Sequence, residues 1–262
     1  MKNQRQHFTF WLLLGAAVVL PMWAFAAVTE EKQWEFDVTD NTSLSIENIN
    51  GDIVINAHAG DKILVIAKLR AGNDESLKKL RVEVTEENGE ISIETHHKKS
   101  SASWFHWGGS DSGQVSYSVS MPSSVALKSI ETVNGDVEIE GVTSSAEVRT
   151  VNGDLHLTGL AGNAVLETVN GSIRVEFSQF NGEQKAVIDT VNGSVVVYLP
   201  EDSSVTVSAE TVNGSIKAGD FNLNANKGRY VGSDLNGQIG AGNAMLEIET
   251  VNGSIKIKSG DS

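Results

Sequence analysis

The sequence predicts an all-β fold, a parallel β-helix (β-solenoid) with coils of about 16–23 residues that we expect to wind right-handed. The main observation is a repeat: the segment ETVNGDVEI at 131–139 returns in close copies until the end of the chain. A short period of this kind is typical of solenoids and other arrays. The Asn-Gly pairs of the repeat and of an earlier relative begin at Asn50, Asn134, Asn152, Asn170, Asn192, Asn213, Asn236 and Asn252.

The second observation is that like residues align when the units are aligned on Asn-Gly. In a parallel solenoid, each coil lies about 4.8 Å from the next, so equivalent positions form columns. A meander of hairpins would also use Asn-Gly turns, but it has no reason to repeat one sequence at every corner. The position two residues after Gly is always a branched apolar residue: Ile53, Val137, Leu155, Ile173, Val195, Ile216, Ile239 and Ile255.

The TVNG corner is expected to have two structural roles. Asn-Gly supplies residues that tolerate positive φ at a sharp turn, and the stacked asparagines can form a ladder of side-chain hydrogen bonds. If a rung is buried, its loss should cost about 1 to 3 kcal/mol. Strict alternation cannot turn both Thr and Val of the motif inward, and the sequence leaves open which of the two is buried.

Residues 1–26 have the pattern of a secretory signal peptide. Lys2 and Arg5 precede an apolar stretch at 8–20, and a small-residue A-F-A pattern ends at Ala26. We therefore expect Sec-type export with cleavage after Ala26, and a location in the periplasm, on the cell surface or outside the cell. An uncleaved anchor is the alternative, because the apolar stretch is close to the roughly 20 residues that span a bilayer.

Residues 27–126 are predicted to be a strand-rich part continuous with the solenoid, which occupies residues 127–262. One helical turn is expected from Asp74 to Leu80 with Asp74 as its cap, and a long loop at 95–114. Period-2 alternation predicts strands in WEFDV, SLSIENI, DIVINAH, KILVIAKLR, LRVEVTE, EISIET and QVSYSVSM.

Composition excludes several classes of function. The formal charge of −14 disfavours nucleic acid and anionic lipid as partners. The chain has no cysteine, hence no disulfide framework and no thiol chemistry. It also lacks the sequence motifs of P-loop, nucleophile-elbow and zinc-protease enzymes. We therefore expect a protein that is not an enzyme, needs no cofactor and does not insert into the membrane once the signal is cleaved.

Three large aromatic residues in the 95–114 loop are the first candidate for a binding site. Trp104, Phe105 and Trp107 would either cover an open end of the fold or contact a sugar or protein. Histidines lie nearby, but their spacing matches no standard metal site. Other candidate positions are those where the repeat is broken, at 178–184 and near Asn236.

Outward positions of the repeats carry charged columns. One column, directly before Thr, contains Glu47, Glu131, Arg149, Glu167, Asp189, Glu210 and Glu249. Another column follows Gly, where Asp136 and Asp154 could form a weak divalent-cation site, because calcium prefers oxygen ligands. The alternatives for these aspartates are a solvated acidic face or the capping of turn amides.

The signal peptide, the early INGDIVI segment, VSMP at 119–122 and the TVNGD and TVNGS units resemble the bacterial "putative adhesin" family of unknown function with β-strand repeats. This resemblance implies a parallel β-helix in the cell envelope and supplies no catalytic residues. The first hypothesis is an exported, non-enzymatic binding or scaffold protein whose partner is an envelope protein or a glycan. The alternatives are a periplasmic envelope-stress or assembly factor and a carbohydrate-active β-helix enzyme.

Overall fold

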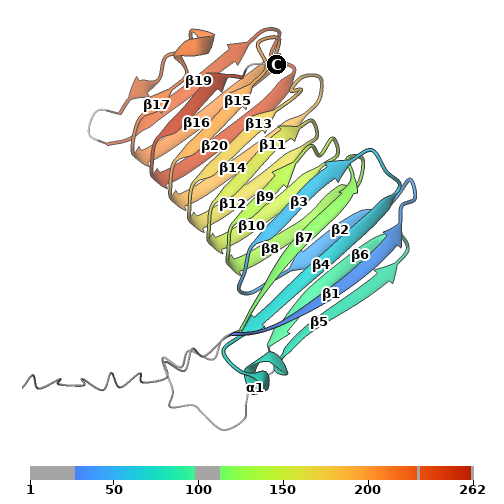
Figure 1. The fold of residues 1–262 in the computed structure, drawn as a ribbon. Coiled ribbons are helices and arrows are strands. Elements are labelled where there is room, and N and C mark those ends of the chain that lie inside the picture. The colour runs from blue at the N-terminus through green and yellow to red at the C-terminus, as the bar shows by residue number, and fades with distance from the viewer. Residues whose placement is uncertain (1–26, 98–112, 229–230, 261–262) are drawn as a thin grey trace, which may run out of the picture.

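The computed structural model describes residues 27–97, 113–228 and 231–260 of the 262. These residues form an all-β structure of two long sheets, of ten and eleven strands, which lie face to face as two layers (Figure 1). The all-β prediction is confirmed, and the repeat units form the solenoid-like part.

The ten-stranded sheet, here the first sheet, begins at the N-terminal end of the fold. In spatial order its strands are β1 (Val28–Asp37), β4 (Lys62–Ala71), β7 (Gln114–Pro122), β3 (Ile53–His58), β9 (Val137–Glu140), β11 (Leu155–Leu160), β13 (Ile173–Phe177), β15 (Val195–Leu199), β21 (Ile255–Ser259) and β17 (Ile216–Lys217).

The eleven-stranded sheet, here the second sheet, faces the first. In spatial order from the same end its strands are β5 (Leu80–Glu87), β6 (Glu90–His97), β2 (Ser43–Glu47), β8 (Ala126–Asn134), β10 (Ala146–Asn152), β12 (Ala164–Asn170), β14 (Lys185–Asn192), β20 (Ala244–Asn252), β16 (Val205–Asn213), β19 (Ser233–Ile239) and β18 (Asn226–Lys227).

Each TVNG unit ends a strand of the second sheet, turns at Asn-Gly and continues as a strand of the first sheet. Adjacent units pair in parallel with their motifs in register, so that Thr150 lies beside Thr168 and Asn152 beside Asn170. In the facing sheet, Leu155 lies beside Ile173. The repeats are therefore stacked coils and not a meander of hairpins.

Antiparallel strands close both ends of this stack. At the N-terminal end, β4 pairs antiparallel with β1 and β7, and β5 pairs with β6. The single short helix here, α1 (Asp74–Leu77), is capped by Asn73, whose side chain accepts a hydrogen bond from the Ser76 amide. The prediction that Asp74 is the cap and that the turn runs to Leu80 was wrong, because Leu80 already begins β5.

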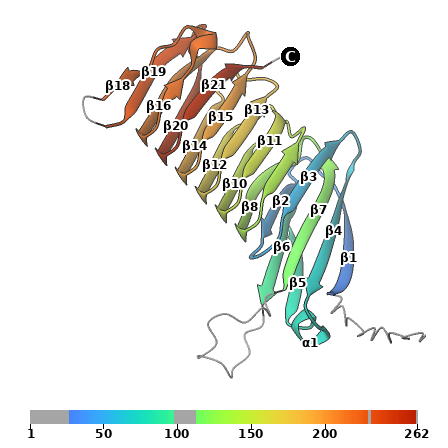
Figure 2. The ribbon, with the colours of Figure 1, turned by 60° about the vertical axis from the view of Figure 1, so that its left-hand side comes forward.

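The order of the coils departs from the order of the chain at the C-terminal end. The last coil, β20 and β21, lies between the coil of β14 and β15 and the coil of β16 and β17 (Figure 2). We expected each coil to stack on the one before it. The long insertion at 220–243 instead lets the chain turn back. Its strand β19 runs antiparallel to β16, and the chain then enters the position between β14 and β16 as β20.

Asn236 is not at a corner, contrary to the sequence-based prediction. It lies in the middle of β19, opposite Ser208 of β16. Ile239 pairs with Val205 in the same ladder and therefore does not occupy the position two residues after a corner glycine. The unit lacks the Thr-Val pair, and its residues form a strand that pairs antiparallel with β16 on one side and with β18 on the other.

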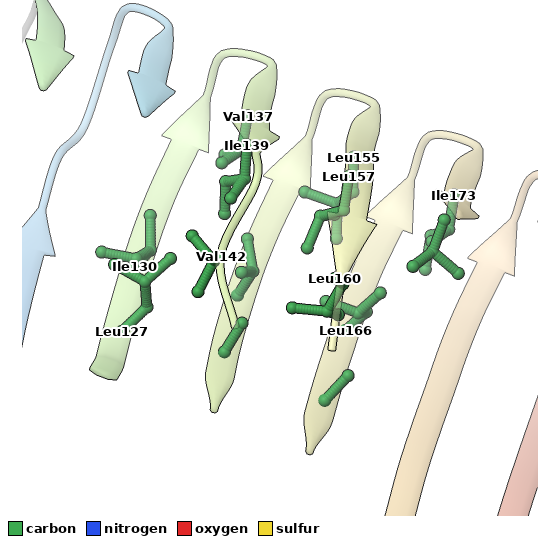
Figure 3. Close-up of a cluster of buried hydrophobic side chains, with 14 of the residues drawn as sticks. Leu127, Ile130, Val137, Ile139, Val142, Leu155, Leu157, Leu160, Leu166 and Ile173 are labelled. Atoms are coloured by element: carbon green, nitrogen blue, oxygen red, sulfur yellow. The ribbon is translucent and has the colours of Figure 1, made fainter. Parts of the chain in front are cut away.

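The core lies between the two sheets and is built from the inward branched residues of every coil. Ile130, Val137 and Ile139 are each at most 1% exposed, and Figure 3 shows them between the layers. The break in the repeat at 178–184 also serves packing, since Phe180 is buried and its ring lies 4.5 Å from that of Phe177.

Candidate functional site

The TVNG corner turns Thr inward and Val outward. Thr168 is 4% exposed, whereas Val169 is 41% exposed. The Oγ1 atoms of the buried threonines each donate to a glycine carbonyl oxygen of the adjacent coil at 2.9 to 3.4 Å. The donors and acceptors are Thr132 and Gly51, Thr150 and Gly135, Thr168 and Gly153, Thr190 and Gly171, Thr211 and Gly253, and Thr250 and Gly193.

The corner glycine is required by close stacking rather than by positive φ. A Cβ on Gly171 would lie 1.8 Å from the carbonyl oxygen of Gly153, and one on Gly193 would lie 1.8 Å from that of Gly171. Of the corner glycines, only Gly51 has a positive φ, and no ladder asparagine does. The expectation that Asn-Gly is needed here for its positive φ was therefore wrong at the repeated corners.

The asparagines form one continuous ladder through seven coils. In each pair an Nδ2 donates to the neighbouring Oδ1 at 2.8 to 2.9 Å. The spatial order is Asn50, Asn134, Asn152, Asn170, Asn192, Asn252 and Asn213. All but Asn50, which is half-buried, are exposed, so the estimate for a buried rung does not apply to them.

The column after the corner glycine is used to cap backbone amides. Oδ1 of Asp136 accepts from the Asp154 amide at 2.8 Å, and Oδ1 of Asp154 accepts from the Ser172 amide at 2.7 Å. Each carboxylate is thus directed along the stack toward the next coil. The described residues contain no group of three His, Cys, Asp or Glu side chains placed to hold a metal ion.

A long groove runs along the outer face of the second sheet, across the intact repeats. It has a volume of about 930 Å³, and its lining consists of three parallel columns from successive coils: the charged column, the threonine column and the outward aliphatic column. Because parallel coils are about 4.8 Å apart, seven of them give the groove a length of about 29 Å.

The aliphatic wall of the groove is a continuous row of exposed branched side chains. Each is 37 to 46% exposed. In spatial order the row, here the valine row, is Ile49, Val133, Val151, Val169, Val191, Val251 and Val212, of which all but Ile49 line the groove.

The charged wall, here the acidic row, has two unlike halves. Near the N-terminal end, Arg149 donates to Glu167 at 2.9 Å, is bonded to Glu147 and lies 3.6 Å from Glu131. These bonds, first that to Glu167, raise the pKa of Arg149. The guanidinium neutralises much of this half.

Beyond Glu167 the acidic row continues through Asp189, Glu249 and Glu210, and Asp234 of β19 lies beside Glu210. Among the described residues, none of these four carboxylates forms an ion pair. Burial, and then the charges of Glu249, Glu167 and Glu247, raise the pKa of Asp189 to about 6. Its buried Oδ1 atom has no hydrogen-bond partner in the described part of the chain.

The other candidates from the sequence do not converge on a site. Trp104, Phe105 and Trp107 lie outside the described residues. His96 lies 3.4 Å from Glu94 and 3.8 Å from Glu83, on the exposed face of β6. The groove itself was missed, although its acidic column was identified, because the sequence did not decide that Val and not Thr faces outward.

The described residues hold a single four-residue α-helix, and no helix among them has the length and apolarity to cross a membrane.

Two solved structures of bacterial proteins show a low-scoring similarity to this chain. A "putative cell adhesion protein" from Clostridium sporogenes is 15% identical with a TM-score of 0.45, over 88% of this chain and 100% of that one. A "putative adhesin" from Bacteroides fragilis is 12% identical with a TM-score of 0.46, over 87% of this chain and 97% of that one. No curated protein matches the sequence.

The model of one protein family, described as Toastrack DUF4097, matches residues 81–258, well over half of the chain. The match covers the stacked repeats from β8 onward, including the inserted last coil, and with them the groove except for its part on the coil of Asn50. The chain therefore belongs to the Toastrack DUF4097 family.

Proposed function

We propose that the protein is an exported, non-enzymatic solenoid of the cell envelope that binds a partner along the groove of its second sheet, as an adhesin-like binding protein or a scaffold. Its repeats would wind as a right-handed parallel β-helix. The signal-peptide pattern at 1–26 supports export. The observation that carries the binding role is the valine row.

The valine row has no role in the core. Single exposed aliphatic residues are ordinary on protein surfaces, but a contiguous apolar strip rimmed by polar groups is typical of an interaction site. Here the strip repeats at every coil, next to a groove about 29 Å long. The inward partner of each valine, the threonine, already makes the bond that joins the coils. A polar residue at the outward position would leave the packing of the core unchanged.

Site-specific photo-crosslinking in the producing cells tests this proposal. A photoreactive residue at Val169 or Val251 should capture a partner, whereas the same residue at His156, which lies on the outer face of the first sheet in the coil next to that of Val169, should not. Adducts from His156 alone would contradict the assignment of the groove. Cell fractionation and N-terminal sequencing of the mature chain check export and cleavage after Ala26.

A further inference from the structure

We propose that the groove takes an extended segment of a protein partner in which basic and apolar residues alternate, with the basic side chains over the acidic row beyond Glu167 and the apolar ones over the valine row. This inference rests on the proposed function, and it names the chemical class of the partner.

The spacing of the two rows favours an extended chain. Val169 and Glu167 are two residues apart on one strand, so their rows run parallel at a separation of about 7 Å, with the threonine backbone between them. An extended peptide laid along this floor turns successive side chains to opposite sides. About nine residues would cover the 29 Å of the groove.

Arg149 shows how a cation is held in the acidic row. Its guanidinium lies among Glu131, Glu147 and Glu167, which come from three neighbouring strands. It therefore occupies one position of the row in the way that a basic residue of a partner would occupy the others. Arginine is well suited to this because its planar group bonds two carboxylates at once.

The other half of the acidic row has the same rung spacing without such a cation among the described residues. Asp189, Glu249 and Glu210 stack on consecutive coils, with Asp234 next to them. Stacked like charges at this spacing repel one another. A row of partner cations would relieve this repulsion, and the adjacent Val191, Val251 and Val212 would cover their aliphatic stems.

Other occupants fit the groove less well. The described groove residues contain no cluster of three metal-binding side chains. Sugars are usually held by aromatic rings and hydroxyl contacts, but this lining is aliphatic and acidic, and its threonine hydroxyls point inward. A second copy could present Arg174 and Lys258, whose charged groups lie over the Tyr198 ring on the first sheet, with Lys256 beside Val196. Binding of a second copy is distinguished by the identity of the photo-adduct and by sedimentation.

Fluorescence anisotropy with labelled synthetic peptides of about nine residues tests the partner class on the purified protein. An alternating Arg-Val peptide should bind, and an alternating Glu-Val peptide should bind at least tenfold more weakly. An Arg-Ser peptide keeps the charges and removes the apolar side chains. It should bind about tenfold more weakly than the Arg-Val peptide. Binding of the Arg-Val peptide should weaken as salt is raised, because the groove charges are open to solvent.

Variants locate the binding. The double variant Glu249→Gln with Glu210→Gln should bind the Arg-Val peptide about fivefold more weakly, as expected for exposed charge pairs. Val251→Ser should weaken binding of the same peptide several-fold. The matched control is Glu138→Gln with Glu140→Gln, two exposed carboxylates on the outer face of the first sheet, which should leave binding unchanged. Equal binding of the Arg-Val and Glu-Val peptides, or no effect of the groove variants, would overturn the inference.

The two proposals can fail separately. A photo-adduct at Val169 without binding of any Arg-Val peptide would leave the groove as a binding site and refute a basic extended partner. If that adduct proved to be a second copy of this chain, or if sedimentation showed self-association abolished by E249Q and E210Q, the partner class would again be wrong. If no adduct formed at Val169 and no peptide bound, both proposals would be refuted.

Discussion

The inner and outer surfaces of the second sheet repeat equally strictly, but for different reasons. On the inner surface, Ile188 and Thr190 are buried, and packing and coil-to-coil hydrogen bonds account for their columns. On the outer surface, Asp189 and Val191 repeat just as regularly, although Val191 is 41% exposed. Regular repetition is therefore not by itself a sign of structural need. Only the inner columns are required by the fold.

The largest expected effect comes from the contact between corners. Gly171→Ala would place a Cβ 1.8 Å from a backbone oxygen of the adjacent coil, so the two coils must separate. We expect a loss of about 5 kcal/mol in the free energy of unfolding, beyond the usual range for overpacking. Urea unfolding followed by circular dichroism measures it. Gly72→Ala, where a Cβ meets nothing within 4 Å, is the control and should be nearly neutral.

The next effect separates the two surfaces within one strand. Ile188→Ala removes a fully buried side chain from β14 and should cost about 3 kcal/mol. Val187→Ala, at the neighbouring outward position, should cost well under half of that, as a partly exposed residue. Equal losses at the two sites would show that the outer surface is also part of the packed structure. Chemical denaturation of both variants decides this.

A smaller effect tests the threonine and valine of one corner. Thr168→Val keeps the shape but leaves the carbonyl of Gly153 without the Oγ1 donor, and should cost about 2 kcal/mol. The reverse exchange outside, Val169→Thr, should change stability by less than about 0.5 kcal/mol. The same Val169→Thr variant should nevertheless weaken binding of the Arg-Val peptide. Thr168 would then contribute mainly to stability, and the adjacent Val169 mainly to binding.

The smallest effect is a gain in stability. The pKa of Asp189 is raised from 3.8 to about 6 in the folded chain, so between these pH values the folded state holds more protons than the unfolded state. Stability should therefore fall as pH rises through this window. Asp189→Asn should stabilise the protein at pH 7 by on the order of 1 kcal/mol, discounted for solvent screening, and should have little effect at pH 4.

Thermal unfolding at both pH values measures the effect of Asp189→Asn. Glu140→Gln, an exposed carboxylate on the first sheet, is the control and should shift stability at neither pH. A destabilised D189N protein at pH 7 would show that the carboxylate makes a favourable contact in the groove.

Much of the fold follows from local sequence patterns. Period-2 alternation was enough for the seven strands before residue 123, and the column of Ile53, Val137 and Leu155 predicted stacked parallel coils. The threonine and valine of the corner were not told apart, because both are branched and a phase reset at the corner was assumed. The inward phase of Ala146 and Val148 in fact runs unbroken to Thr150, so the alternation of the strand held this information. The role of the corner glycine was also hidden, since it depends on how closely the adjacent coil approaches.

The order of the last coils could not be predicted for a different reason. ETVNGSIKA and ETVNGSIKI are nearly identical, so either could stack on the coil of Asn192. The groove likewise depends on which outward residues become neighbours in space. The missing Thr-Val pair near Asn236 was visible in the sequence. Only the antiparallel pairing of β19 with β16 shows that this unit forms a straight strand and not a corner.

The position of the last coil has a consequence for how the molecule is assembled. Asn252 bonds to Asn192, 60 residues earlier, whereas the three rungs directly before it join residues 18 or 22 apart. Coils up to β15 can stack as they are synthesised, but the coil that joins β14 to β16 is made after both of its neighbours. The coil of β16 and β17 therefore cannot complete its hydrogen bonding until residues 244–259 have been synthesised. Once it has, the C-terminal strands are clamped between two neighbours and are not the first to fray.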